Sequence, residues 1–322
     1  MAEISGANVT GKRSTPWATA ALLLVLLPAA APVAQTVRVP GTSVALAPPP
    51  GFSPSSRFPG FEHADLQASI MVTEVPGPFA QLTGGMTAAG LATRGMTLIS
   101  RSTPQIPGKR ALLLHVSQSA GGTDFLKWML VAGDAKASVM IVATFPKSAE
   151  GQLSGALEAS LLSAVLGATP PKDHFEGLPF RISPTPALKI AGRMSNLLVL
   201  SESGNIEPQG PQAAVFVVGS SLAPVALTDL KAFAATRARQ TKQLKGLRIT
   251  QEGPTTIDGI AAHELLAEGT DVATGRAVTL YQVVLPDSGG YILMQGMVAS
   301  TRAAALVPEF RRVADTFRRL AR

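Results

Sequence analysis

The chain of 322 residues contains no cysteine, which excludes disulfide bonds, thiolate metal sites, a thiol nucleophile and a lipid-modified cysteine at an export junction. Exported proteins often use disulfides, so the folded part of this chain must be stabilised by its hydrophobic core alone. Two domains of about 135 to 150 residues would each bury an adequate core. Hydrophobic residues make up 46% of the chain and charged residues 15%, which indicates a folded globular protein.

Catalytic motifs are also missing. The sequence has no Gly-x-Ser-x-Gly elbow, His-Glu-x-x-His pair, phosphate-binding loop, dinucleotide fingerprint or Ser-x-x-Lys. We therefore predict a non-catalytic protein without a cofactor. The alternative is an uncharacterised hydrolase that uses carboxylates such as Asp124, Glu264 or Asp271. No spacing argument supports that alternative.

Histidine is scarce, with four residues in the chain. His115 and His263 lie in equivalent strand regions, but they are three positions out of register, so we expect them on opposite faces of their strands. Glu62, His63 and Asp65 form the one dense polar cluster around a histidine. A loop before a strand explains this cluster as well as weak metal binding does, and we predict no metal site.

The N-terminal segment resembles an export signal. Lys12 and Arg13 are followed by an apolar stretch at residues 20–27 and by small residues at 29–34. This order predicts export and cleavage after Ala34, which gives a periplasmic or secreted protein. No other apolar run reaches the length of a membrane span.

An uncleaved anchor is the alternative reading of the same segment. Residues 17–34 are just long enough to cross a bilayer. Pro28 and Pro32 argue against a continuous helix there, because proline breaks the hydrogen-bond pattern of a helix interior. We therefore expect cleavage.

A weak internal repeat is the most informative feature of the sequence. The spacing from Gly95 to Gly108 equals that from Gly246 to Gly259, and an Ile precedes each closing glycine by two positions. An apolar run follows in both copies. One domain has therefore been duplicated, and we place the first repeat at residues 35–167 and the second at 174–322. A short linker at 168–173 contains two adjacent prolines, which favour an extended conformation.

Each repeat is rich in strand patterns, with one helix midway and one at its end. Short glycine-containing connections between consecutive strands imply an antiparallel sheet packed by two helices, an α+β fold. The middle helices are expected at residues 79–94, weakened by glycines, and at 228–245, capped by Thr228. The terminal helices are expected at 148–165, capped by Ser148, and near the C-terminus. The latter places an apolar stripe at helical spacing, formed by Leu306, Phe310, Val313, Phe317 and Leu320.

The order of these elements resembles a known family. The opening Val-Arg-Val-Pro-Gly-Thr-Ser-Val-Ala-Leu-Ala-Pro-Pro-Pro-Gly-Phe52, the middle helix, the glycine-bounded strand pair and the terminal helix are similar to the PsbP/Mog-like fold. The similarity covers both repeats, although the second has Pro184-Thr-Pro-Ala187 where the first has Pro-Pro-Gly-Phe. Members are generally binding or assembly-accessory modules, so the resemblance implies an exported protein that docks an envelope protein or an apolar ligand. It assigns no functional residues.

The C-terminal tail supplies the candidate contact residues. From Thr301 onward, six arginines stand against two carboxylates. Four of them, Arg311, Arg312, Arg318 and Arg319, fall away from the apolar stripe and give the closing helix a cationic face. This face suits an anionic membrane surface or an acidic partner, and the alternative is a solvated face that aids solubility. An exported protein without a basic groove is not expected to bind nucleic acid.

Overall fold

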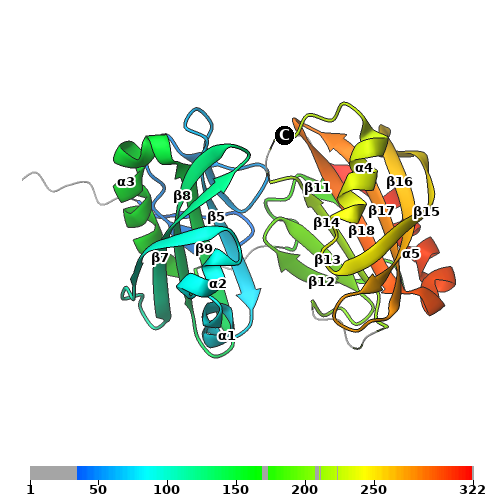
Figure 1. The fold of residues 1–322 in the computed structure, drawn as a ribbon, viewed down its shortest axis with the longest axis horizontal. Helices are drawn as coiled ribbons and strands as arrows, with labels where there is room; N and C mark the ends of the chain where they lie inside the picture. Colours follow the sequence, from blue (N-terminus) through cyan, green and yellow to red (C-terminus); the bar gives the residue numbers. More distant parts are fainter. Residues whose placement is uncertain (1–34, 169–172, 207–209, 211, 223, 321–322) are drawn as a thin grey trace, which may run out of the picture. The chain divides into compact units, whose positions relative to one another are not determined.

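The computed structural model describes residues 35–168, 173–206, 210, 212–222 and 224–320 (Figure 1). The predicted leader at residues 1–34 and most of the predicted linker lie outside the described residues. No helix among the described residues is both long and apolar enough to cross a membrane.

Two seven-stranded antiparallel sheets form the body of the two repeats. The first sheet has the strand order β3-β4-β5-β9-β8-β7-β6 and the second has the order β12-β13-β14-β18-β17-β16-β15. Corresponding strands of the two repeats therefore occupy the same places in their sheets, which confirms two tandem α+β repeats. The strands of the first sheet are β3 (Ser53–Pro54), β4 (Gly60–His63), β5 (Ala68–Pro76), β6 (Met96–Ser102), β7 (Arg110–Ala120), β8 (Thr123–Gly133) and β9 (Ala137–Pro146). Those of the second are β12 (Lys189–Met194), β13 (Leu197–Ser201), β14 (Val215–Ser220), β15 (Leu244–Ile257), β16 (Ile260–Asp271), β17 (Ala277–Asp287) and β18 (Gly290–Ala299).

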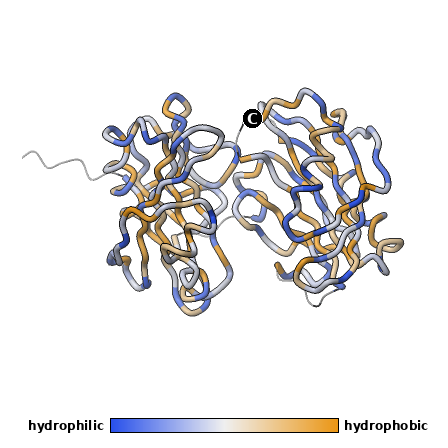
Figure 2. Tube along the Cα trace, in the orientation of Figure 1, coloured by the Kyte–Doolittle hydropathy of each residue, from blue (hydrophilic) through white to orange (hydrophobic). Residues whose placement is uncertain are grey.

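Helices pack on both faces of each sheet. In the first repeat, α1 (Phe79–Gly84) and α2 (Ala88–Ala92) lie on one face and α3 (Glu150–Leu162) lies on the other. In the second, α4 (Leu230–Arg239) and α5 (Ala303–Asp315) take the same two places. Apolar residues alternate along the strands and fill a core on each face, and the hydrophobic segments in Figure 2 largely follow these strands.

Short outer strands close each repeat in the same way. A three-stranded sheet joins β1 (Val37–Arg38), β2 (Val44–Leu46) and β10 (Val165–Leu166), while β11 (Phe180–Arg181) pairs with β19 (Arg318–Arg319). In both repeats the strand that follows the terminal helix therefore pairs with a strand from the start of that repeat.

The glycines that revealed the repeat occupy the same structural position. Gly108 lies in the turn between β6 and β7 and Gly259 in the turn between β15 and β16, with φ of +68° and +74°. Backbone with such φ values favours glycine, because other residues meet a steric penalty there. The prediction that the two glycines are equivalent is confirmed. A β-bulge also recurs, at Ile99 in β6 and Thr250 in β15, equally far from Gly95 and Gly246.

The helix boundaries differ from the sequence-based expectations. Helix α3 begins at Glu150 after a single 3-10 turn at Lys147–Ala149, so Ser148 does not cap it, and Val165 lies in β10. Helix α4 is capped by Asp229, whose carboxylate accepts the Ala232 N–H at 2.9 Å, so the expected cap at Thr228 is wrong. The expected single helix at residues 79–94 is divided into α1 and α2.

Tertiary pairing ends two of the helices early. Helix α4 stops at Arg239 because Lys245, expected to be helical, pairs with Thr270 in the sheet. The closing helix stops at Asp315, and Phe317 packs after the helix end with its ring 5.5 Å from that of Phe180. The expectation that Leu320 is packed is wrong, because its side chain is 39% exposed. Strand pairing with a distant segment overrides local helix propensity in these places.

Candidate ligand groove between helix α4 and strand β15

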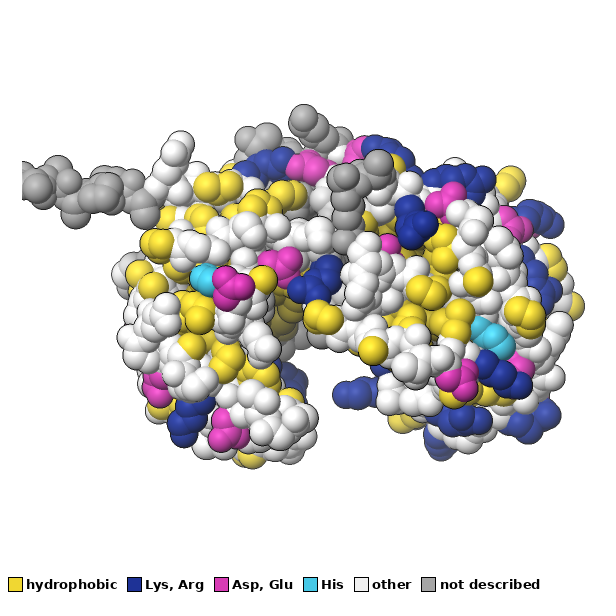
Figure 3. All heavy atoms as spheres, turned by 90° about the horizontal axis from the view of Figure 1, so that it is seen from above, with side chains coloured by type: hydrophobic (Ala, Val, Ile, Leu, Met, Phe, Trp, Pro, Cys, Tyr) yellow, Lys and Arg dark blue, Asp and Glu magenta, His cyan; other side chains and the backbone are white. Residues whose placement is uncertain are grey.

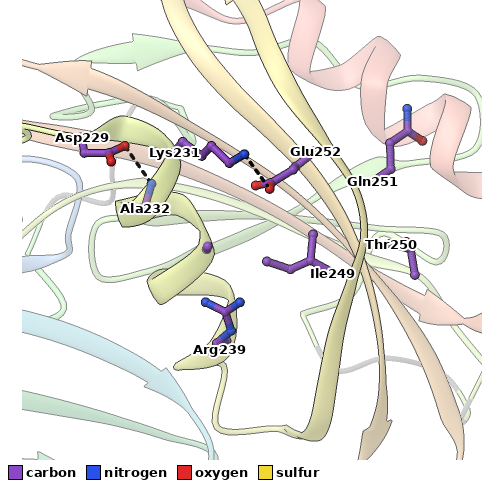
Figure 4. A pocket seen from close by; sticks show the side chains of 9 residues that line it. Asp229, Lys231, Ala232, Arg239, Ile249, Thr250, Gln251 and Glu252 are labelled. Carbon is purple, nitrogen blue, oxygen red and sulfur yellow. Dashed lines mark hydrogen bonds and ion pairs between the residues drawn. The ribbon is translucent and has the colours of Figure 1, made fainter.

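A hollow of about 520 Å³ lies between helix α4 and strand β15 in the second repeat (Figure 4). The helix contributes one side and four consecutive strand residues contribute the other. The residues that line it are Asp229, Lys231, Ala232, Ala235, Arg239, Ile249, Thr250, Gln251 and Glu252. We call this hollow the α4–β15 groove.

Small side chains and a bulge create the groove. Ala234 and Ala238 of α4 are fully buried against the sheet, while Ala232 and Ala235 line the groove and leave it open. In β15 the pairing shifts around Thr250, so that Ile249 and Glu252 both point toward the helix and Gln251 points away, as Figure 4 shows. Such bulges redirect side chains and often lie beside binding sites.

The carboxylates of the groove are already engaged. One Glu252 oxygen lies 3.1 Å from the Lys231 ammonium and the other 3.3 Å from Nε2 of His263. Hydrogen bonds from Lys231, and then from His263, hold the pKa of the Glu252 carboxyl below its ordinary value. Asp229 is occupied as the helix cap. Glu252 therefore acts as a fixed negative charge at one end of the groove.

The other end of the groove is lined by Arg239, which belongs to a segment rich in cations. The segment from Leu230 to Gln251 has no carboxylate and six cations, Lys231, Arg237, Arg239, Lys242, Lys245 and Arg248. Arg248 pairs with Glu268 at 2.8 Å, and the Arg237 guanidinium lies 5.8 Å from the centre of the Tyr291 ring.

Three of these cations, Arg239, Lys242 and Lys245, are exposed and have no ion pair with any described residue. We call them the α4–β15 cations. Arg239 lines the groove at the end of α4, whereas Lys242 in the connection and Lys245 at the start of β15 lie outside the lining residues. The face of the second repeat seen in Figure 3 carries Lys and Arg side chains along its rim. The sequence-based prediction of contact residues did not include these three cations, although a run of cations without carboxylates is a signal present in the sequence.

A smaller hollow occupies a related place in the first repeat. It has a volume of about 340 Å³ and lies between α1 and the β6–β7 hairpin, where Arg101, Lys109 and Arg110 contribute to its lining. Arg101 stands as far from Gly95 as Glu252 does from Gly246, so the two hollows adjoin equivalent strand positions. The Arg110 guanidinium lies 5.0 Å from the centre of the Phe79 ring. The duplicated fold therefore retains a hollow between its middle helix and its outermost hairpin.

Of the four candidate arginines of the tail, Arg311 has the least exposed side chain. Its Nε and Nη2 donate to one oxygen of Glu264 at 3.0 and 2.8 Å, and the other oxygen accepts the Tyr281 hydroxyl at 3.0 Å. The hydrogen bond to Glu264 raises the pKa of Arg311, and burial, followed by the charge of Glu264, raises the pKa of Tyr281. Arg311 therefore ties α5 to β16.

The other three arginines also lie near carboxylates. Arg312 pairs with Glu309 one helical turn away. Arg318 and Arg319 lie in β19, not on the helix, at 3.8 Å from Asp258 and 4.0 Å from Asp287. The structure thus divides the four candidates between two elements instead of one helical face. Contact of these arginines with an anionic surface stays a prediction.

Three of the four histidines lie in strands, whereas His174 is exposed in a turn. His63 is in β4, not in a loop, with its ring 5.5 Å from that of Phe52, and its neighbour Glu62 pairs with an arginine. Across the described ranges, no three His, Asp or Glu side chains gather in a group suited to a metal ion.

His115 and His263 face opposite sides of their sheets, as predicted. His115 stacks on Trp128 at 4.1 Å, on the face covered by α3. His263 lies beside Leu265 on the face covered by α4. Burial lowers the pKa of His115, which favours its neutral form.

The three carboxylates of the hydrolase alternative are not brought together. Asp124 belongs to the first sheet and accepts a hydrogen bond from Ser119. Glu264 and Asp271 stand seven positions apart on β16, and Asp271 accepts hydrogen bonds from Thr274 in the following turn. Along an extended strand that separation is roughly 23 Å. These residues do not share a site.

Comparison with known proteins gives limited similarity. No protein-family model matches the chain, and no curated protein matches its sequence. Among solved structures, LpqN of Mycobacterium tuberculosis, involved in cell envelope biogenesis, is 11% identical over 43% of this chain and 81% of its own, with a TM-score of 0.32.

Two further structures show likeness of the same order. The cyanobacterial PsbP of Synechocystis is 14% identical over 47% of this chain and 84% of its own, with a TM-score of 0.27. A chain of the Tle4–Tli4 complex is 10% identical over 88% of this chain and 97% of its own, with a TM-score of 0.31. A PsbP protein is thus among the similar structures, and at these identities and TM-scores the likeness assigns no function to this chain.

Proposed function

We propose that this protein is an exported, non-catalytic binding or assembly-accessory module of the cell envelope, and that its second repeat binds a partner in the α4–β15 groove. The observation that carries the proposal is the groove itself, an open hollow of about 520 Å³ between a helix and the outermost strand of a sheet. Its volume falls within the range of about 300 to 1,000 Å³ that is usual for ligand sites.

The chemistry of the lining supports binding over catalysis. Glu252 has a lowered pKa and stays ionised at neutral pH, so it serves as a fixed charge and not as a proton carrier. Asp229 holds the helix N-terminus. Charged groups exceed apolar ones along the hollow, which favours a protein segment over an apolar ligand as the partner.

The export part of the proposal rests on the leader. Basic residues, a short apolar stretch and small residues stand in the order of a cleaved signal. N-terminal sequencing of the mature protein is expected to begin at Gln35. A protein that retains Met1 in the cytoplasm would contradict export.

Blocking the groove tests the binding function. Ala232 is exposed and lines the groove, so Ala232→Trp fills it without entering the core. Ala305 holds the same third position in α5, is also exposed and lies away from the groove, which makes Ala305→Trp the matched control. An unbiased peptide array is used to select peptides that bind the mature wild-type protein. These peptides are expected to lose binding to the Ala232→Trp variant and to bind the Ala305→Trp variant as they bind the wild type.

Two results would overturn the proposed function. One is an array from which the wild-type protein selects no peptide. The other is a set of selected peptides that bind both tryptophan variants equally well, because they would then bind elsewhere.

A further inference from the structure

We propose that the α4–β15 groove binds an extended acidic peptide segment, recognised by the α4–β15 cations Arg239, Lys242 and Lys245. This inference rests on the proposed function and names the chemistry of its partner. It assigns the charge selectivity of the protein to the segment that joins α4 to β15 and not to the arginines of the tail.

The α4–β15 cations carry positive charge that no neighbouring carboxylate among the described residues balances. The α4–β15 cations have no ion pair with any described residue, in contrast to Lys231 and Arg248, which pair with Glu252 and Glu268. Like charges held close together repel one another, and an acidic ligand relieves that repulsion while it gains Coulomb attraction. At the opposite end Lys231 balances the charge of Glu252, so the net positive charge lies at the Arg239 end and fixes the direction of an acidic ligand.

The position of strand β15 in its sheet also suits a peptide ligand. β15 ends the strand order of its sheet and, among the described strands, pairs with β16 alone, so no described strand pairs with its other backbone edge. Pro254, further along β15, has no N–H, as is usual for an edge strand. The stretch from Lys245 to Glu252, whose pairing with β16 shifts at two places, is the part of the strand that lies beside the cations and the groove. It corresponds to a ligand of about eight residues, or roughly 26 Å.

The groove suits a peptide better than a lipid surface. A membrane contacts protruding residues, whereas the lining alanines lie in a hollow. One large apolar side chain is exposed beside the cations, Val272, whose N–H donates to the Gln243 carbonyl at 2.8 Å. A membrane-binding surface of this kind would carry several such side chains.

Charge-matched variants test the proposal in the mature full chain. The groove variant carries Arg239→Gln, Lys242→Gln and Lys245→Gln. The control variant removes three exposed cations of the first repeat through Arg94→Gln, Lys136→Gln and Lys147→Gln, so both lose the same net charge. Thermal melting establishes that each variant folds. Fluorescence anisotropy then measures binding of labelled peptides of about eight residues, either rich in Asp and Glu or with Asn and Gln in the same places.

The acidic peptide is expected to bind the wild type and the control variant with similar affinity, more weakly as salt increases. The groove variant is expected to lose roughly tenfold or more in affinity for it. The peptide with Asn and Gln in place of Asp and Glu, called the amide peptide, is expected to bind all three proteins weakly. Hydrogen exchange of the amides in residues 245–252 is expected to slow when the acidic peptide is bound.

Contrary results separate this inference from the proposed function. Equal binding of the acidic and amide peptides, or equal loss in the groove and control variants, would refute the acidic partner. The groove function would stand if Ala232→Trp still abolished binding. Binding of the wild type to phosphatidylglycerol vesicles that the groove variant loses, without acidic peptide binding, would identify a lipid surface instead and also refute the proposal.

Discussion

Truncation of Phe317 tests the packing that ends the second repeat. Its side chain is fully buried just after α5, in the core cluster that contains Phe180, Phe310 and Val313. A buried Phe→Ala substitution removes apolar contacts and leaves a cavity, which together cost about 3 to 5 kcal/mol. The ring pair with Phe180, at 5.5 Å between centroids, accounts for about 0.5 to 1.5 kcal/mol of that cost.

The assay is urea unfolding of the mature protein followed by circular dichroism and by the fluorescence of Tyr281 and Tyr291, which both lie in the second repeat, with Leu320→Ala as the control. Leu320 lies three positions further on and is 39% exposed, so its truncation is expected to cost under about 1 kcal/mol. A double-mutant cycle with Phe180→Ala isolates the pair, since contacting residues do not add independently. Equal costs for Phe317→Ala and Leu320→Ala would refute the placement of Phe317 in the core.

Three further predictions concern charge, backbone and pH. Replacing Arg318 and Arg319 by Gln is expected to change the free energy of unfolding by under about 1 kcal/mol, because both side chains are exposed. If these arginines also contact an anionic surface, the variant keeps its melting temperature but loses salt-sensitive binding to anionic vesicles. Gly259→Ala is expected to cost about 1 to 2 kcal/mol through its φ of +74°, whereas Gly151→Ala within α3 is expected to stabilise; similar melting temperatures for the two would contradict the turn geometry. Glu252 has a lowered pKa, so the folded state binds its proton more weakly than the unfolded state does, and its stabilising contribution is present at neutral pH and lost as pH falls through the carboxyl range. In urea titrations, Glu252→Gln is therefore expected to reduce the difference in stability between neutral and acidic pH, and an unchanged difference would argue against the ion pairs.

Hydrophobic alternation predicted most of the strands because it is a local property. Strands near Ala68, Ala111, Ala137 and Val278 follow directly from period-two patterns. The strand pair β3–β4 and strand β12 lack such a pattern and contain turn-forming residues such as Pro54 and Gly192. Their pairing with neighbours is what makes them strands.

The duplication, the antiparallel α+β class and the equivalence of Gly108 and Gly259 follow from local sequence patterns, because turns and alternation depend on residues close together in the chain. The cationic run from Lys231 to Arg248 is likewise present in the sequence. That this run borders a groove follows from the folded arrangement of α4 and β15. The bulge at Thr250 and the partnership of Glu252 with Lys231 and His263 depend on β16 and α4, which lie elsewhere in the sequence and reach β15 only when the sheet is formed.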